Sequence, residues 1–157
     1  MLQPQSPDES LMDVVGHMLA DGAFVMADPD PEPGAELPDG LRVEVSFDGP
    51  RRGVVLIDAP PDLGMEIALN LGADEEAPDE SSAVEALREL GNMITGALLP
   101  RLFGTETVFH LGIPTPGRMV GADEAPPVCQ HEVALVSDEG HRTRVRVRFD
   151  DLPGVSP

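Results

Sequence analysis

Two polar side chains in the segment from Ser81 to Leu99 have types and a spacing that could serve chemistry. Glu89 carries a carboxylate, and Asn92 carries a carboxamide three positions later. Residues three apart on an α-helix lie side by side, so both groups would project from one rigid support. What the pair could do depends on which other chemistries the sequence leaves open.

The segment that would position this pair reads as an amphipathic helix. Apolar residues recur in steps of three and four, which draws one stripe for the core: Ala83, Leu87, Leu90, Ile94, Ala97 and Leu98. At about 100° per residue, the opposite side carries Glu85, Glu89, Asn92 and Gly96, with Arg88 and Thr95 flanking them. We expect Ser81 or Ser82 to cap the helix and Pro100 to end it.

The charge of the chain excludes several classes of function. Asp and Glu number 29 against ten basic residues, the net charge is −19, and every basic residue is arginine. Without lysine, neither a Walker-type phosphate loop nor Schiff-base or pyridoxal chemistry is available. A chain this acidic should also repel nucleic acid and anionic membrane surfaces, so neither is expected as a partner.

Metal and nucleophile chemistry find no support in the spacing of residues. The histidines are dispersed, no serine stands in a GxSxG elbow, and Cys129 has no second cysteine as a partner. Cys129 falls in a predicted strand, where a buried, inert thiol is expected. We therefore expect no metal or cofactor of its own. The lone cysteine, the acidic N-terminus and the absence of a long apolar run favour a cytoplasmic protein.

The order of patterns predicts the fold class. A helix from Ser10 to about Gly22 precedes an acidic loop over 27–40, an alternating strand over 41–49, an apolar strand over 53–59, and a short helix after Pro61. The helix with the polar pair follows, then a strand over 106–112 and a hairpin over 129–149. This order predicts a single α+β domain over 1–157, with flexible ends at 1–9 and 150–157. Its two layers would be an antiparallel sheet and helices on one face.

The last predicted strand carries a row of arginines. Arg142, Arg144, Arg146 and Arg148 alternate with less polar residues and would share one face of the sheet. We interpret the row as a solvated face that pairs with neighbouring carboxylates such as Glu132 and Glu44, rather than as a nucleic-acid site.

The outward pair could be no more than a solvated polar helix face, because an ExxN pattern is short. Gly91, Asn92 and Gly96 are nevertheless poor helix formers, and glycine costs about 1 kcal/mol relative to alanine in a helix. A loss of helix propensity without an evident packing gain is expected where a partner must approach the helix backbone closely.

The stretch ELGNMITG, preceded by DESSAVEAL, resembles the motif helix of the CheX-like chemotaxis phosphatases, relatives of CheC and FliY. The order of elements and a GxP segment from Gly112 to Pro114 agree with this resemblance. It implies hydrolysis of the aspartyl phosphate on a response-regulator receiver domain such as CheY. Asn92 would orient the attacking water and Glu89 would pair with the receiver's lysine. Glu85, Arg88 and Gly96 would contact the partner, Mg²⁺ would belong to the receiver, and a homodimer is possible.

Two features depart from the family pattern. CheC-type members carry two motifs, whereas the other candidate here, Glu66 with Asn70, has a spacing of four, so we expect a single site. The charge of −19 opposes long-range attraction to an acidic receiver pocket, so recognition would depend on local contacts. Two alternatives remain at this point: a non-catalytic module that binds a receiver or another signalling partner through the same face, and a regulatory domain whose polar helix is inert.

Overall fold

The described residues form a sheet of seven strands in the order β1-β6-β7-β3-β2-β4, with β5 also paired to β2. The computed structural model describes residues 6–32, 40–72, 79–121 and 128–150. All strand pairs are antiparallel. The strands are β1 (Ala27–Pro29), β2 (Gly40–Asp48), β3 (Gly53–Ala59), β4 (His110–Leu111), β5 (Arg118–Val120), β6 (His131–Ser137) and β7 (Arg142–Phe149).

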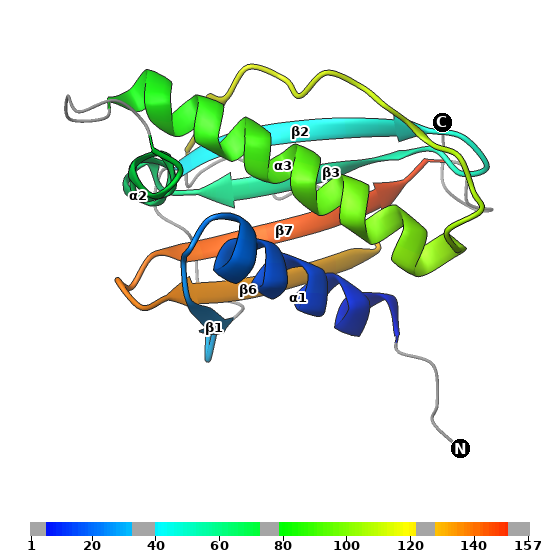
Figure 1. The fold of residues 1–157 in the computed structure, drawn as a ribbon, viewed down its shortest axis with the longest axis horizontal. Helices are drawn as coiled ribbons and strands as arrows, with labels where there is room; N and C mark the ends of the chain where they lie inside the picture. Colours follow the sequence, from blue (N-terminus) through cyan, green and yellow to red (C-terminus); the bar gives the residue numbers. More distant parts are fainter. Residues whose placement is uncertain (1–5, 33–39, 73–78, 122–127, 151–157) are drawn as a thin grey trace.

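The helices form a second layer on one face of this sheet. They are α1 (Pro7–His17), continued by the π-helical turn η1 (Met18–Gly22), then α2 (Pro61–Asn70) and α3 (Glu80–Phe103). In Figure 1, α3 crosses in front of β2 and β3, and α1 lies in front of β6. The predicted α+β architecture of two layers is therefore confirmed.

The hydrophobic core fills the space between the two layers. The predicted stripe of α3 faces it, with Leu87, Leu90, Ile94 and Leu98 fully buried, while Ala97 is half-buried. Val43, Val45 and Phe47 of β2 point into the same core, as their alternation predicts. Because the buried stripe fixes the rotation of α3, it also fixes which side chains of this helix face outward.

The start of α1 differs from the sequence prediction. Its cap is Ser6, whose hydroxyl accepts a hydrogen bond from the backbone N–H of Glu9 at 3.2 Å, and Pro7 occupies the first turn. The predicted cap, Ser10, is buried inside the helix. Residues 7–9, expected in a flexible end, are therefore helical, whereas 1–5 and 151–157 lie outside the described residues.

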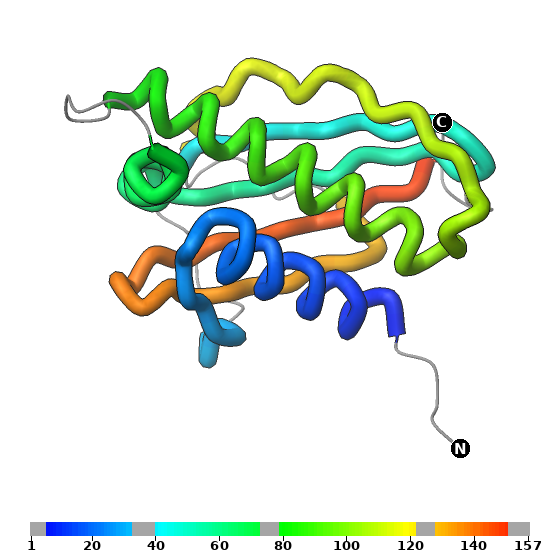
Figure 2. Tube along the Cα trace, in the orientation of Figure 1, coloured from blue at the N-terminus to red at the C-terminus, as the bar shows by residue number. Residues whose placement is uncertain are grey.

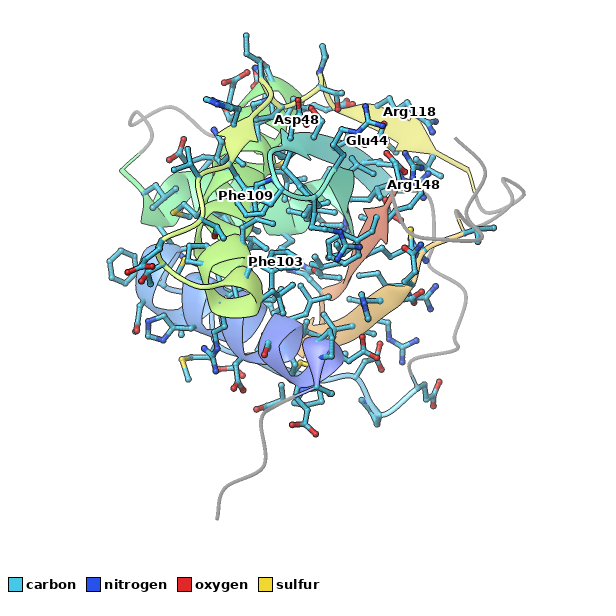
Figure 3. All side chains as sticks on the ribbon, turned by 90° about the vertical axis from the view of Figure 1, so that its right-hand side faces the viewer. Glu44, Asp48, Phe103, Phe109, Arg118 and Arg148 are labelled. Carbon is cyan, nitrogen blue, oxygen red and sulfur yellow. The ribbon has the colours of Figure 1, made fainter. Side chains whose placement is uncertain are left out.

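Both ends of α3 also differ from the prediction. Asp79 caps the helix, because its carboxylate accepts from the backbone N–H of Ser82 at 3.0 Å, and this bond lowers the pKa of Asp79. The helix continues through Pro100 to Phe103. Phe103 packs in a ring cluster with Phe109 and Phe149, and Figure 3 shows Phe103 and Phe109 together at the end of α3. This packing offsets the usual cost of proline within a helix.

Three short strands differ from the sequence prediction. β1 and β5 lie where the sequence indicates loops, and the strand predicted over 106–112 is reduced to β4. Cys129 precedes β6 instead of lying within a strand, and it is half-buried. Burial raises the pKa of its thiol, in keeping with the expected inert cysteine.

The sheet face away from the helices carries a buried ionic network, which corrects the prediction of a solvated arginine row. Asp58 accepts hydrogen bonds from Arg42 Nε at 2.6 Å and from Arg146 Nη1 at 2.6 Å. Arg146 also donates to Glu132 at 3.1 Å, which confirms that predicted partner. Arg42, Asp58 and Arg146 are 6%, 7% and 4% exposed. Figure 3 shows Arg148 on this same side of the sheet.

The segment that follows α3 returns beside the helix. Figure 2 shows the chain from Gly104 to Val120 running back along α3 and β2. Backbone bonds from Gly112 N to Ser46 O and from Thr115 N to Glu44 O fasten it to β2. We call residues 104–117 the strap.

Candidate functional site

The exposed stripe of α3 consists of the residues that the sequence assigned to it. Glu85, Glu89 and Gly96 are exposed, while Arg88 and Asn92 are half-buried. Within the described part of the chain, neither the Glu89 carboxylate nor the Asn92 carboxamide makes a side-chain hydrogen bond or an ion pair. A carboxylate and a carboxamide therefore stand side by side on this face and are available to a partner.

The support beneath the stripe is close-packed. Leu90 and Ile94 are 0% exposed, and the backbone at Gly91 lies against β2 and β3. A Cβ at Gly91 would come within 3.0 Å of Val45 Cγ2 and 3.4 Å of Ile57 Cδ1. Gly91 thus has a packing reason, which corrects the expectation that its helix cost served the approach of a partner. The close contact holds Asn92 on a fixed backbone.

Gly96, unlike Gly91, agrees with the expectation that a glycine in this helix has no packing role within the chain. A Cβ at Gly96 would meet nothing within 4 Å, so its helix cost gains no packing inside the chain. Pro100 lacks an N–H, so the carbonyl of Gly96 lacks its usual helical donor four residues on. Open backbone therefore lies one turn beyond Asn92 on the exposed stripe.

Arg88 has a structural contact that the sequence did not reveal. Its guanidinium donates to Glu85 at 2.7 Å and to the carbonyl of Pro114 in the strap at 3.0 Å. The strap is therefore fastened to α3 beside the stripe, and Ile113, next to Pro114, is 85% exposed. Contact of Glu85 and Arg88 with a partner stays a prediction.

Thr95 does not flank the outward side, so the placement that periodicity predicts for it is wrong. The residue is 0% exposed, and its hydroxyl donates to the carbonyl of Gly91 at 2.8 Å. Thr95 lies at the edge of the stripe, and the folded chain covers it. Helical periodicity alone does not reveal this burial.

The second polar pair, Glu66 and Asn70, is engaged within the fold. Asn70 Nδ2 donates to the carbonyl of Ala23 at 3.1 Å and to that of Phe24 at 3.3 Å. Glu66 lies 3.3 Å from a ring nitrogen of His141. Sequence reasoning missed the role of Asn70, because Asn70 and Phe24 are far apart along the chain and no local pattern joins them.

The part of the chain that the structure describes holds neither a candidate metal site nor a candidate membrane-spanning helix. His17, His131 and His141 each face a single carboxylate, and the described residues hold no group of three potential ligands. Among the described helices, none combines the length and apolarity that crossing a bilayer requires.

Comparison with known proteins identifies a family whose model covers the exposed stripe of α3. The model of the family described as chemotaxis phosphatase CheX matches residues 43–149. This range contains most of β2, all of β3 and α3, and the whole of the exposed stripe. No curated protein matches the chain.

Solved structures with the same fold come from several bacteria. CheX from Vibrio vulnificus is 18% identical, with 95% of this chain and 99% of that chain covered and a TM-score of 0.68. CheX from Borrelia burgdorferi, solved as a complex with CheY, BeF₃ and Mg²⁺, is 21% identical over 92% and 97%, with a TM-score of 0.64. FliY from Thermotoga maritima is 15% identical over 97% and 94%, with a TM-score of 0.57. At these identities, the likeness establishes the fold.

Proposed function

This chain belongs to the family of the chemotaxis phosphatase CheX, and we propose from that premise that it accelerates hydrolysis of the aspartyl phosphate on a CheY-type receiver domain. The observation that carries the proposal is the pair Glu89 and Asn92, unpaired within the described chain and displayed on a rigid helix. The complex of Borrelia burgdorferi CheX with CheY supports a receiver as the partner.

Asn92 is the proposed water-orienting group. In the reaction, a water oxygen attacks phosphorus, the aspartate oxygen leaves, and the products are a free carboxylate and inorganic phosphate. Such phosphoryl transfer needs positioning and charge neutralisation more than covalent help from the protein. The carboxamide of Asn92 can accept from the water and donate to the phosphoryl group, which holds the water in line.

Glu89 is the proposed docking group. Its carboxylate would pair with the lysine of the receiver's phosphorylation site, about one helical turn from Asn92. Mg²⁺ belongs to the receiver in this proposal, as the presence of Mg²⁺ in the Borrelia burgdorferi complex supports. The receiver therefore supplies the cations, and this chain supplies an amide and an anchor.

Decay of a phosphorylated receiver, measured with and without this protein, tests the proposal against the binding-module alternative. A phosphatase accelerates the decay with the receiver in molar excess. A binding module forms the complex without changing the decay, which would overturn the proposal.

Homodimerisation also stays a prediction, and sedimentation equilibrium would test it.

Replacing Glu89 by alanine should weaken docking more than it slows bound turnover. Loss of one partly exposed ion pair predicts a KM about fivefold to fiftyfold higher, with kcat changed much less. Steady-state decay at varied receiver concentration separates the two terms. Glu139→Ala is the matched control, because it removes the same charge from the exposed turn between β6 and β7. Unchanged KM and kcat for Glu89→Ala would remove Glu89 from the interface.

Replacing Gly96 by alanine should stabilise the helix and impair docking together. Alanine gains up to about 1 kcal/mol over glycine in a helix, and no atom of the described chain opposes the new Cβ. On the stripe, however, that methyl group would obstruct a partner that approaches the open backbone. Gly16→Ala in α1 is the matched control, since a Cβ there also meets nothing within 4 Å.

Thermal unfolding and receiver binding should therefore move in opposite directions for Gly96→Ala, while Gly16→Ala changes stability alone. Equal receiver affinity for Gly96→Ala and the wild type would show that the open backbone at Gly96 does not serve docking.

A further inference from the structure

The turn between η1 and β1 presents a large aromatic side chain to solvent at an unusual backbone position. Phe24 has a φ of 58°, in the left-handed region that a bulky residue rarely adopts, and no other non-glycine described residue has a positive φ. The side chain is 67% exposed. Strain of this kind persists where the surrounding structure holds it, and it is common at ligand-binding positions.

The residues around Phe24 hold the turn firmly. Ala23 and Val25 are 0% and 2% exposed, and Val25 N donates to the carbonyl of Leu19 at 2.7 Å. The carboxamide of Asn70 then binds the carbonyls of both Ala23 and Phe24. The phenyl ring is therefore displayed outward by anchored neighbours, at little cost in ordering when a partner binds.

The contact with Asn70 gathers further apolar side chains at the same place. Leu69 and Leu71 flank Asn70 at the end of α2 and are 55% and 43% exposed. In Figure 1, the turn after α1 lies next to α2. We call Phe24, Leu69 and Leu71, which are exposed where the turn after η1 meets the end of α2, the exposed corner.

The exposed corner adjoins the stripe of α3. Gly22, two residues before Phe24, lies against Met93, because a Cβ on Gly22 would stand 3.2 Å from Met93 Cε. Met93 directly follows Asn92 in α3. A specific interface covers about 800 Å² and about 20–30 residues on each partner. A partner seated over Asn92 would therefore extend over elements beside α3, and the turn that leads from Gly22 to Phe24 is one of them.

We propose that the exposed corner is a second contact surface for the receiver domain, on which an apolar side chain of the receiver packs against Phe24. This inference rests on the proposed function, since it takes the receiver as the occupant of the α3 stripe. The net charge of −19 and an acidic receiver pocket repel at long range, so a neutral apolar contact supplies attraction that charge does not weaken.

Phe24→Asn isolates the contact from the fold. Asparagine tolerates the left-handed region better than phenylalanine, so the variant should unfold at the same temperature as the wild type or higher. The variant loses the ring that the receiver would bury in the complex, so the KM for the phosphorylated receiver should be about tenfold to a hundredfold higher, with kcat unchanged. Val128→Asn is the matched control: Val128 is 90% exposed and stands shortly before β6, which lies behind α1 rather than behind α3.

The outcomes separate this inference from the proposed function. Wild-type acceleration with a raised KM for Phe24→Asn alone supports the exposed corner as a receiver contact. Wild-type acceleration with an unchanged KM for Phe24→Asn overturns the inference and leaves the proposed function intact. A dimer that Phe24→Asn dissociates, again with unchanged KM, assigns the corner to a second copy and also overturns it. No acceleration by the wild type refutes the proposed function itself.

Discussion

Asn92→Ala should lower the acceleration of receiver dephosphorylation by roughly tenfold to a thousandfold, because the attacking water loses the group that positions it. The effect should appear in kcat, since the proposed docking group, Glu89, is unchanged in this variant. Asn92 is half-buried and its side chain makes no hydrogen bond with the described residues, so the variant should fold as the wild type does. Single-turnover decay with a saturating excess of this protein measures the step.

A second variant tests whether the amide of Asn92 is needed rather than its size. Asn92→Asp keeps the shape but removes the N–H donors and adds a negative charge beside the phosphoryl group. It should be at least as slow as Asn92→Ala. Full acceleration by either variant, with normal receiver binding, would remove Asn92 from the mechanism.

Asp58→Ala should cost about 3–5 kcal/mol of the free energy of unfolding, because it removes the carboxylate that two buried guanidinium groups share. Asp58 binds both Arg42 and Arg146 on the sheet face away from the helices. Urea denaturation measures the loss. Its control is Asp150→Ala, which breaks the pair with Arg148, where both side chains are about 40% exposed and a change below about 1 kcal/mol is expected.

The basis of this prediction can be checked in a variant that removes the charges together. Combining Asp58→Ala with Arg42→Met and Arg146→Met leaves no uncompensated charge from the triad, so much of the lost stability should return. A loss that stays as large in the triple variant would show that packing at Asp58, rather than charge, sets the cost.

The helix that carries the site was predictable because its period is strong. Five of the six stripe residues are buried and the sixth, Ala97, is half-buried, so periodicity alone places Glu89 and Asn92 on the outward side. Its ends were less predictable. Pro100 signals a helix end locally, but the ring contacts of Phe103 with Phe109 and Phe149 extend the helix, and these contacts join residues far apart in the chain.

The two glycines of the motif show a similar limit. Gly91 and Gly96 look alike in the sequence, yet Gly91 is pressed against Val45 and Gly96 is open. Their difference depends on how closely the backbone of α3 approaches the sheet at each position. Helical periodicity gives the side of the helix that faces the sheet, but it does not give the distance between the two layers.

The arginine row and the short strands needed the sheet order. Alternation placed Arg146 on one face, and only the register between β2, β3 and β7 brings Arg42, Asp58 and Arg146 together. β1, β4 and β5 are two or three residues long and lie at the edges of the sheet, so their pairing is set by neighbours rather than by their own residues.

The most direct test of this account is the decay of phosphorylated CheY-type receivers from the same organism, at a receiver concentration well above that of this protein. Substoichiometric wild-type protein should shorten the lifetime of the aspartyl phosphate over many turnovers, and Asn92→Ala should do so far less. A lifetime unchanged by wild-type protein, even at equimolar concentration and with demonstrated binding, would contradict it.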